Sequence, residues 1–310
     1  MKTLVIGGAG FIGLNLSEAL LAAGHCVRIL ERAGVQPPEF LRNNPRLEWV
    51  NGDFAVDSDI ERALEGQEYV FHLASSTLPK TSNDNPRHDV ISNVVATLGV
   101  LQKSKEAGVR RIVFVSSGGT VYGQPQSIPI TETHPNHPLS SYGICKLTIE
   151  KYLELFWHLH QLPYLVYRLS NPYGRFQRPS SAQGAVTVFL ARALRGETIE
   201  IWGDGSVIRD YIYISDAVSG LMTSLAYSGR ERIFNLGSGI GTSLNELLAI
   251  VSTIVGTPPN VIYKPSRSFD VERNILDINK LSRETGWAPK VNLYDGLKLT
   301  KDFLTKGDGI

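Results

Sequence analysis

Three glycines near the N-terminus constrain this chain more than any other feature of its sequence. Gly7, Gly10 and Gly13 follow the apolar run Thr3–Gly7 and open the helical pattern Phe11–Ala23. Glycines at this spacing let the backbone turn tightly and let a pyrophosphate approach, while the helix N-terminus supplies N–H donors. The alternative is a glycine-rich turn that binds nothing. The strand-to-helix context favours a dinucleotide site, which we assign to Gly7, Gly10, Phe11, Ile12 and Gly13.

Beyond the glycines, short apolar runs alternate with amphipathic stretches along the first 170 residues. This alternation predicts an α/β fold, a Rossmann-type doubly wound parallel sheet covered by helices on both faces. Strands are expected at Thr3–Gly7, Cys26–Leu30, Leu47–Val50, Tyr69–Leu73, Ile112–Val115 and Tyr164–Leu169, and helices at Phe11–Ala23, Asp57–Leu64, Asp89–Ala107 and Ser141–Leu159.

The rhythm changes after about residue 170. Asn171–Gln183 is rich in Pro, Gly, Ser and Arg and is expected to be an ordered loop over a site. We expect residues 1–170 to form a dinucleotide-binding domain with a return segment at about 207–235. Residues 171–206 and 236–310 are expected to form a smaller C-terminal α/β region that binds the substrate. Its expected elements are helices at about Ala185–Arg195, Asp216–Tyr227, Leu244–Val255 and from Asn279, a strand at Glu200–Trp202 and the segment Val207–Ile214.

Composition excludes several classes of partner. The 31 Lys and Arg nearly balance the 30 Asp and Glu, so nothing favours nucleic acid or an anionic membrane surface. No apolar run reaches the roughly 18 residues of a membrane helix. The two cysteines, Cys26 and Cys145, cannot build a disulfide scaffold, and neither has metal-ligand spacing. We therefore expect a cytoplasmic protein with no metal site.

Polar residues at the ends of the predicted strands extend the dinucleotide site. Glu31 closes the second strand, where a carboxylate accepts hydrogen bonds from the adenosine ribose and repels a 2′-phosphate. This favours NAD over NADP, although Arg32 beside it weakens the preference. Asp53 and Phe54 follow the third strand, where Asp53 could contact adenine. Leu73, Ala74 and Ser75 follow the fourth strand and would lie along the cofactor.

Tyr142 and Lys146 form the candidate catalytic pair. They are four residues apart, and so they share one helix face. A phenol has a pKa near 10, and a neighbouring ammonium and a nicotinamide cation both favour its phenolate. Lys146 can also hold the nicotinamide ribose. Ser116-Ser117 ends the fifth strand, where a hydroxyl could reach the same substrate oxygen. A Tyr-x-x-x-Lys pair arising by chance is the alternative.

With these motifs in order, the chain resembles the extended short-chain dehydrogenase/reductase family, and within it the UDP-glucose (UDP-galactose) 4-epimerases. The matching motifs run through almost the whole chain. They are Gly7–Gly13, Asn51-Gly52-Asp53, His72-Leu73-Ala74, Asn93-Val94, Ser116–Gly123, Tyr142 with Lys146, Arg168–Gly174, Trp202–Gly205, Arg209–Ile212 and Gly286-Trp287.

The resemblance implies a role for each matching residue. Tyr142 would accept the proton, Lys146 would orient the cofactor, and Asn93 would join the cofactor site. Asn171 and Arg209 would hold the nucleotide diphosphate, Val186 and Trp202 would flank the base, and Arg267 with Asp270 would reach phosphate and ribose. Each has an alternative. Arg209-Asp210 could be a surface ion pair, Trp202 could belong to the core, and Arg267 and Asp270 could be solvated loop charges.

One position departs from the family pattern. The family's catalytic Ser or Thr falls on Gly118, which has no hydroxyl, so Ser117 or Thr120 must substitute, and we favour Ser117. The same stretch argues against a 4,6-dehydratase. Those enzymes carry an Asp-Glu pair where Gly119 and Thr120 stand, and the elimination has no other evident agent.

The resemblance therefore implies an NAD-dependent 4-epimerase that inverts C4 of a nucleotide-linked hexose through a 4-keto intermediate. The alternatives are an NAD(P)H-dependent 4-keto reductase of a dTDP- or GDP-linked 6-deoxysugar, and a dinucleotide-binding scaffold without catalysis. The family's pocket-gating position falls on Asn274, a small residue that predicts tolerance for N-acetylhexosamines. Family members usually dimerise through two helices, here about Asp89–Ala107 and Ser141–Leu159, though their apolar residues could equally be core.

Overall fold

The computed structural model describes residues 1–77, 81–179, 184–266 and 271–306. The chain divides into two compact units. The first contains Met1–Val121, Pro138–Arg168 and Leu221–Phe234, and the second contains Tyr122–His137, Leu169–Gly220 and Asn235–Ile310. Each unit is described by itself.

The first unit is built on a parallel sheet, as expected. Strand β1 pairs in parallel with β2 and β4, and further parallel pairs join β2 to β3 and β4 to β5. The full order is β10-β6-β5-β4-β1-β2-β3, which reverses direction at β1 as in a doubly wound dinucleotide-binding fold. The strands are β1 Lys2–Ile6, β2 Cys26–Glu31, β3 Leu47–Asn51, β4 Tyr69–His72, β5 Arg111–Ser117, β6 Tyr164–Leu169 and β10 Ile233–Leu236.

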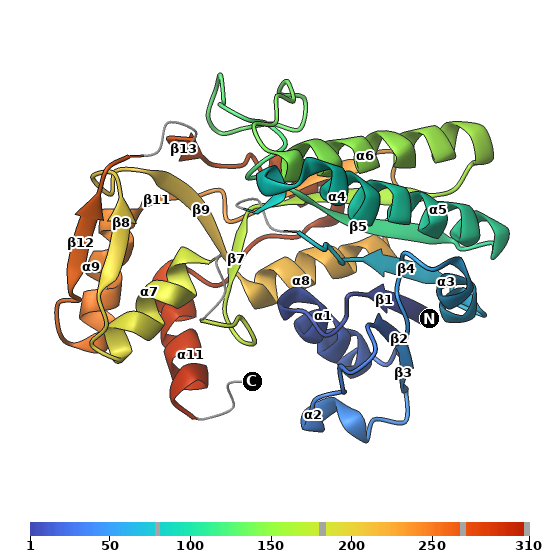
Figure 1. Ribbon diagram of the computed structural model, residues 1–310, viewed down its shortest axis with the longest axis horizontal. Helices are drawn as coiled ribbons and strands as arrows, with labels where there is room; N and C mark the ends of the chain where they lie inside the picture. The colour runs from blue at the N-terminus through green and yellow to red at the C-terminus, as the bar shows by residue number, and fades with distance from the viewer. Residues whose placement is uncertain (78–80, 180–183, 267–270, 307–310) are drawn as a thin grey trace. The chain divides into compact units, whose positions relative to one another are not determined.

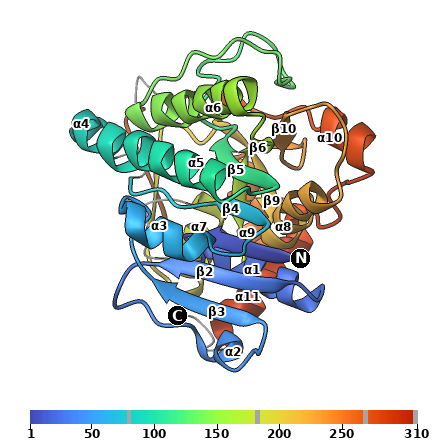
Figure 2. The same ribbon diagram turned by 90° about the vertical axis from the view of Figure 1, so that its right-hand side faces the viewer.

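Helices cover both faces of this sheet. Figures 1 and 2 show α5 and α6 side by side on one face together with α3, and α1 on the opposite face. On the first face, Ile60 of α3, Leu101 of α5 and Ile149 of α6 join strand residues such as Leu4 and Phe114 in one buried apolar cluster. The helices are α1 Phe11–Ala22, α2 Glu39–Arg42, α3 Asp57–Leu64, α4 Pro86–Asp89, α5 Ala96–Glu106 and α6 Ser141–His160, with the short 3-10 helices η1 Ser82–Asp84 and η3 Thr223–Leu225.

The helix expected at Asp89–Ala107 has a more complex structure. It starts earlier, at Pro86, because the side chain of Asn85 caps it by accepting a hydrogen bond from the His88 N–H. Between α4 and α5 lies a π-helical segment, η2, at Val90–Val95. A π-helical turn rotates the residues that follow it relative to a regular α-helix, and such turns frequently occur at functional sites. Here the buried residues of the turn are Asn93 and Val94.

The second unit holds small sheets and a group of helices. Strand β9 lies between β11 and β13 and also pairs with β7, while β8 pairs with β12 in parallel. Figure 1 shows β8 and β12 side by side with α9 and α7 close by. The elements are β7 Asn171–Tyr173, α7 Ala185–Leu194, β8 Ile199–Trp202, β9 Ile208–Tyr213, β11 Gly241–Ser243, α9 Leu244–Val255, β12 Val261–Lys264, β13 Arg273–Asn274, α10 Asn279–Thr285 and α11 Leu293–Thr305, with α8 at Ile214–Met222.

The observed units differ from the expected division in two places. The segment that returns to the first unit is Leu221–Phe234, not about 207–235, because β9 pairs with β7, β11 and β13 of the second unit. Tyr122–His137 also belongs to the second unit, where Tyr122 donates a hydrogen bond to Asn235 at 2.6 Å. In addition, the expected loop Asn171–Gln183 begins with the strand β7. Within the described residues, no helix has the length and apolar character that crossing a membrane requires.

Candidate active site

The glycine loop of the first unit has the form that a bound diphosphate needs. Gly7 has a φ of +83°, and a Cβ there would lie 2.9 Å from the Ala74 backbone. A Cβ on Gly13 would lie 2.4 Å from the Gly7 carbonyl oxygen, so the first turn of α1 can pack this close to the loop only because Gly13 has no side chain. Helix α1 starts after Gly10, which supplies no side-chain cap to the first N–H groups. Donors at a helix N-terminus beside a side-chain-free loop fit a pyrophosphate.

Glu31 lies beside this loop. One oxygen of its carboxylate accepts a hydrogen bond from the Ala9 N–H at 3.1 Å, and the other accepts from the Arg32 N–H at 3.1 Å. The carboxylate is therefore fixed next to the phosphate loop, at the carboxyl end of β2, where an adenosine ribose is expected. Asp53 accepts a hydrogen bond from the Ala55 N–H, and Phe54 packs edge-on against His72 at 5.4 Å.

The remaining predicted cofactor residues meet in one place. Ala74, Ser75, Asn93, Tyr142 and Lys146 line the same small cavity in the first unit. Asn93 accepts a hydrogen bond from the Ser76 N–H at 2.9 Å, which joins the π-helical segment to the loop after β4. Leu73 donates its N–H to the Ile6 carbonyl and so continues β4 beside β1. The structure thus brings together predicted cofactor residues from three parts of the sequence: the loop after β4, the π-helical segment and α6.

Tyr142 and Lys146 project from the first turns of α6. Ser140 caps this helix by accepting a hydrogen bond from the Gly143 N–H. The Lys146 ammonium nitrogen donates to the Val115 carbonyl at 2.9 Å and lies 5.5 Å from the centre of the Tyr142 ring. Burial lowers the pKa of Lys146 to about 8, against the opposing influence of the Glu150 and Asp89 carboxylates. Burial, helped by the Asp89 carboxylate, raises the pKa of the Tyr142 phenol.

Because of these pKa shifts, Tyr142 and Lys146 need added positive charge nearby before Tyr142 can act as a base. A phenol whose pKa lies above its usual range is protonated at neutral pH. Phenolate forms only where added positive charge offsets the burial, and Lys146 supplies part of that charge. A cationic nicotinamide ring would supply the rest. The geometry therefore suits a site that is activated when its cofactor is bound.

The hydroxyls around Gly118 have distinct environments. Ser116 is buried and donates to Glu150 at 2.5 Å, so its hydroxyl is already used. The Ser117 carbonyl accepts the N–H groups of Thr120 and Val121, which forms a tight turn after β5. The Thr120 hydroxyl is buried and, among the described residues, has no hydrogen-bond partner. Both Ser117 and Thr120 stay candidates for the hydroxyl that Gly118 lacks.

Two buried carboxylates at this site were not identified from the sequence. Glu150, one turn after Lys146, forms an ion pair with Arg168 at 2.6 Å, and both side chains are almost fully buried. Asp89 accepts hydrogen bonds from Ser141 at 2.6 Å and from Asn93 at 2.8 Å. Glu150 recurs at helical spacing after Lys146, which is the signal that could have indicated it; nothing in the sequence around Asp89 indicates burial.

The second unit contains the cavity in which the predicted nucleotide ligands meet. It has a volume of about 290 Å³, and Asn171, Val186, Trp202 and Arg209 all line it. Trp202 is 40% exposed, so it is not a core residue. Tyr211, which the sequence analysis did not select, also lines the cavity, and its buried hydroxyl has no hydrogen-bond partner among the described residues. Aromatic surface, a guanidinium and an unused hydroxyl are groups that a nucleotide diphosphate can engage.

The remaining residues that the sequence singled out for the substrate site have different outcomes. Asp210 is fully buried and accepts hydrogen bonds from Ser238, Gly239 and Leu276, so Arg209-Asp210 is not a surface ion pair. Asn274 is 1% exposed, lies in β13 beside Arg209 of β9, and does not line the described cavity. Arg267 and Asp270 lie outside the described residues.

Comparison with known proteins identifies the family of the chain. Residues 3–237 match the NAD dependent epimerase/dehydratase family. The chain belongs to this family. The family's cofactor is NAD, in agreement with the preference that Glu31 predicts, and the Rossmann-type fold and the family resemblance inferred from the sequence are confirmed.

The chain is similar over its whole length to two curated proteins and to a solved structure. The chain is 37% identical over 308 residues to the UDP-glucose 4-epimerase of Mycolicibacterium smegmatis, with 98% of each chain covered. It is 32% identical over 310 residues to a dTDP-4-dehydro-6-deoxyglucose reductase of Escherichia coli, again with 98% of each covered. The crystal structure of the Thermotoga maritima UDP-glucose 4-epimerase with UDP-glucose superposes with a TM-score of 0.93 at 38% identity and covers 99% of both chains.

Proposed function

We propose that this protein is an NAD-dependent 4-epimerase that inverts C4 of a nucleotide-linked hexose of the UDP-glucose and UDP-galactose type. The observation that carries the proposal is the Lys146 ammonium held 5.5 Å from the Tyr142 ring in a chain of the NAD dependent epimerase/dehydratase family. Tyrosine and lysine in this arrangement are equipped to remove and return the proton of one sugar hydroxyl.

The chain's own residues divide the work. The glycine loop with Phe11 and Ile12, together with Glu31, Asp53, Phe54, Leu73, Ala74, Ser75 and Asn93, would hold NAD in the first unit. When bound, NAD supplies a reversible acceptor for the hydrogen on C4. Tyr142 takes the proton of the C4 hydroxyl and later returns it, and Lys146 keeps positive charge beside the phenol. Ser117 would hold the reacting oxygen, with Thr120 as the alternative.

The second unit would bind the nucleotide end of the substrate. Asn171 and Arg209 line its cavity and are proposed to hold the diphosphate, while Val186 and Trp202 flank the base. Arg267 and Asp270 are proposed as further ligands by the family resemblance alone, and Asn274 as the residue that tolerates an N-acetyl group. Inversion requires that the nucleotide stays bound while the sugar reacts, so firm nucleotide binding suits this function.

A panel of substrates tests the proposal. The purified protein, with no cofactor added, is incubated with UDP-glucose, UDP-galactose, their N-acetyl forms, and dTDP- and GDP-hexoses. We expect interconversion of the UDP-hexoses and release of NAD on denaturation. Tyr142→Phe is expected to abolish turnover and keep the NAD. A protein without bound NAD that turns over no sugar in this panel would refute the proposal.

The second candidate is reduction of a 4-keto 6-deoxysugar nucleotide. The full-length likeness to a dTDP-4-dehydro-6-deoxyglucose reductase favours keeping it. Strict dependence on added NADPH, with no resident NAD, would support the reductase over the epimerase. Glu31 beside the phosphate loop counts against a 2′-phosphate and therefore against NADPH.

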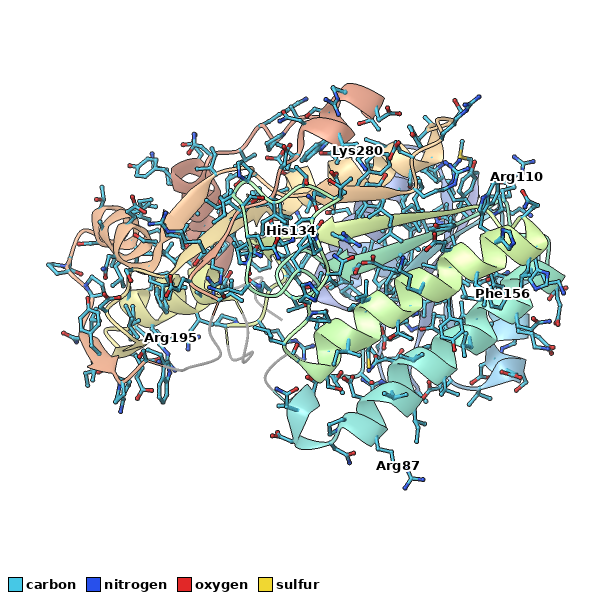
Figure 3. All side chains as sticks on the ribbon, turned by 90° about the horizontal axis from the view of Figure 1, so that it is seen from above. Arg87, Arg110, His134, Phe156, Arg195 and Lys280 are labelled. Atoms are coloured by element: carbon cyan, nitrogen blue, oxygen red, sulfur yellow. The ribbon has the colours of Figure 1, made fainter. Side chains whose placement is uncertain are left out.

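We also propose that the protein is a cytoplasmic homodimer. Large apolar side chains are exposed on the two helices that the resemblance assigns to dimer formation. Ile91 and Val95 of η2 are 51% and 54% exposed, and Ile144 and Leu155 of α6 are 51% and 42% exposed. Figure 3 shows these helices side by side, viewed from above. Covering such a face with a second copy would remove apolar surface from water. Both cysteines are unpaired, as expected in a reducing compartment.

A further inference from the structure

Asp89 is a buried carboxylate on an otherwise exposed stretch of helix. Its side chain is 0% exposed, whereas Arg87, His88 and Val90 around it are all exposed. Figure 3 shows Arg87 pointing away from the helix. Asp is almost never fully buried unless its oxygens have partners, because desolvation of the charge is costly. The hydrogen-bond donors around Asp89 therefore indicate its role.

Each of the two carboxylate oxygens of Asp89 accepts two hydrogen bonds. One accepts from the Thr77 hydroxyl at 2.5 Å and from the Asn93 side-chain amide at 2.8 Å. The other accepts from the Ser141 hydroxyl at 2.6 Å and from the Cys145 thiol at 3.4 Å. These four donors come from the loop after β4, the π-helical segment and the first two turns of α6. One carboxylate thus joins three separate segments of the chain.

A further segment, η1, holds the backbone at Tyr142. The Tyr142 N–H donates to the Ser82 hydroxyl at 3.1 Å, and the Ser141 N–H donates to the Asn83 side chain at 2.9 Å. Both acceptors lie in η1, a few residues before Asp89. The N-terminal turn of α6, which carries the candidate base, is thus capped from the segment that Asp89 anchors. The Ser140 hydroxyl also caps this helix by accepting a hydrogen bond from the Gly143 N–H.

We propose that Asp89 is a positioning residue of the reaction, which fixes Asn93 and the first turn of α6 and thereby sets both the orientation and the charge environment of Tyr142. This inference rests on the proposed 4-epimerase function. Asp89 acts on Tyr142 through Ser141 and through its own charge. It is not itself a proton donor or acceptor in the reaction.

The charge environment around Tyr142 comes from few groups. Lys146 and Cys145 share α6 with it, Asp89 faces it from α4, and Glu150 and His72 face Lys146. Burial, and secondarily Lys146, lowers the pKa of His72 to about 3, so its ring is neutral at pH 7. The Asp89 carboxylate opposes phenolate at Tyr142 and supports the ammonium at Lys146. Burial, with the Asp89 charge as the second cause, keeps the Tyr142 phenol protonated until further positive charge is present.

Two substitutions separate positioning from charge. Asp89→Asn keeps the shape and one acceptor oxygen but removes the charge, while Asp89→Ala removes both. We expect Asp89→Ala to lower kcat ~10- to 100-fold, because a displaced base loses its alignment. KM for the nucleotide sugar is expected to change by less than about threefold, since the nucleotide cavity is untouched. Asp57→Asn, an exposed aspartate in the first turn of α3, is the matched control and should leave kcat unchanged.

The pH profile reports the charge. In Asp89→Asn the acid limb of kcat is expected to move to lower pH by about half a unit or more, because phenolate is no longer opposed. A purely structural residue would not move this limb. The Tyr142 transition is also followed without turnover, from ultraviolet difference spectra between each variant and its Tyr142→Phe partner. It should fall to lower pH in Asp89→Asn.

The outcomes are distinguishable. If wild-type protein turns over no sugar, the epimerase proposal fails, and the spectral titration still tests Asp89. If wild-type protein is active but neither the acid limb nor the Tyr142 transition moves in Asp89→Asn, the charge role is wrong. If Asp89→Ala, folded as judged by circular dichroism, retains full kcat, the positioning role is wrong.

Discussion

At the residue scale, three buried charges lie along α6 and the end of β6. Lys146 is 5% exposed, and the Glu150–Arg168 ion pair one turn further along α6 is 2–3% exposed. The Ser116 hydroxyl and two nitrogens of Arg168 all donate to Glu150, so this carboxylate is satisfied from both sides. Buried pairs of this kind add little net stability, but leaving one partner alone is costly. These hydrogen bonds join α6 to the ends of β5 and β6.

Removing one member of the Glu150–Arg168 pair should lower the stability of the protein, because the other charge stays buried without its partner. Arg168→Met leaves Glu150 buried without its cation, and we expect the free energy of unfolding to fall by ~3–5 kcal/mol in urea titrations. The double substitution with Glu150→Gln should recover part of this loss. Lys151→Met breaks only the exposed pair with Glu154 and should change stability by less than about 0.5 kcal/mol. Equal losses in the single and double variants would contradict this account.

Lys146 gives a pH dependence of known sign. Its folded-state pKa is lowered from 10.5 to about 8, so between pH 8 and 10.5 the unfolded chain binds more protons, and stability rises with pH from this residue. Lys146→Met removes the contribution. We expect the Met variant to have the higher Tm near pH 7 and the advantage to shrink towards pH 10, measured on protein free of NAD. An advantage that grows with pH would show the sign to be wrong.

At the scale of single elements, α6 has a buried face and an exposed apolar face. Its buried face carries Cys145, Lys146, Ile149 and Glu150, and its outer face exposes Ile144 and Leu155. The spacing of these residues follows the helical period, so one helix presents both the candidate base and an apolar outer stripe. The neighbouring η2 segment repeats this division, with Asn93 buried and Ile91 exposed.

A charge on the outer stripe tests the proposed dimer. Ile144→Glu is expected to convert dimers to monomers in sedimentation velocity experiments at micromolar concentration, because two buried carboxylates would face each other across a symmetric interface. Ile262→Glu, on the exposed strand β12, has the same chemistry and a similar exposed fraction, and should leave the oligomeric state unchanged. A wild-type protein that sediments as a monomer would rule the proposal out.

On the scale of the whole molecule, each unit contains its own binding residues. The glycine loop and the Tyr142–Lys146 pair belong to the first unit, and the cavity lined by Trp202 and Arg209 belongs to the second. Ligands that bind only the folded state stabilise it, by about 2.7 kcal/mol at a hundredfold excess over Kd. Cofactor and nucleotide should therefore stabilise the protein through different residues.

Thermal unfolding can test whether the nucleotide and the cofactor bind to different residues. UDP is expected to raise the Tm of the wild-type protein, and Trp202→Ala should remove most of that increase, since the aromatic face against the base is lost. The content of bound NAD should stay the same in this variant. Trp49→Ala, on β3 of the first unit, is the control and should keep the response to UDP. An undiminished UDP response in Trp202→Ala would remove this residue from the nucleotide site.

The order of the elements could be predicted from the sequence, and so could the residues of the candidate site, because both predictions depend on local patterns. The glycine spacing, the alternating strands and helices, and the four-residue interval between Tyr142 and Lys146 are fixed by backbone geometry over a few residues. The strands from Cys26 and Tyr164 and the helix Asp57–Leu64 lie close to where they were expected. The π-helical turn was not predicted, and its buried Asn93 contacts Ser76 and Thr77, which are distant in the chain.

Tertiary structure decided what depends on residues distant in the chain. Glu150 is buried because Arg168 meets it from 18 residues away, and Asp89 because Ser141 and Cys145 reach it from 52 and 56 residues away. Burial of a charge requires such partners, and no local pattern reveals them. Pairing also placed β9 with the second unit. The sequence by itself predicted a dinucleotide site with a tyrosine and a lysine beside it. The tertiary structure decided which charges are buried beside that tyrosine.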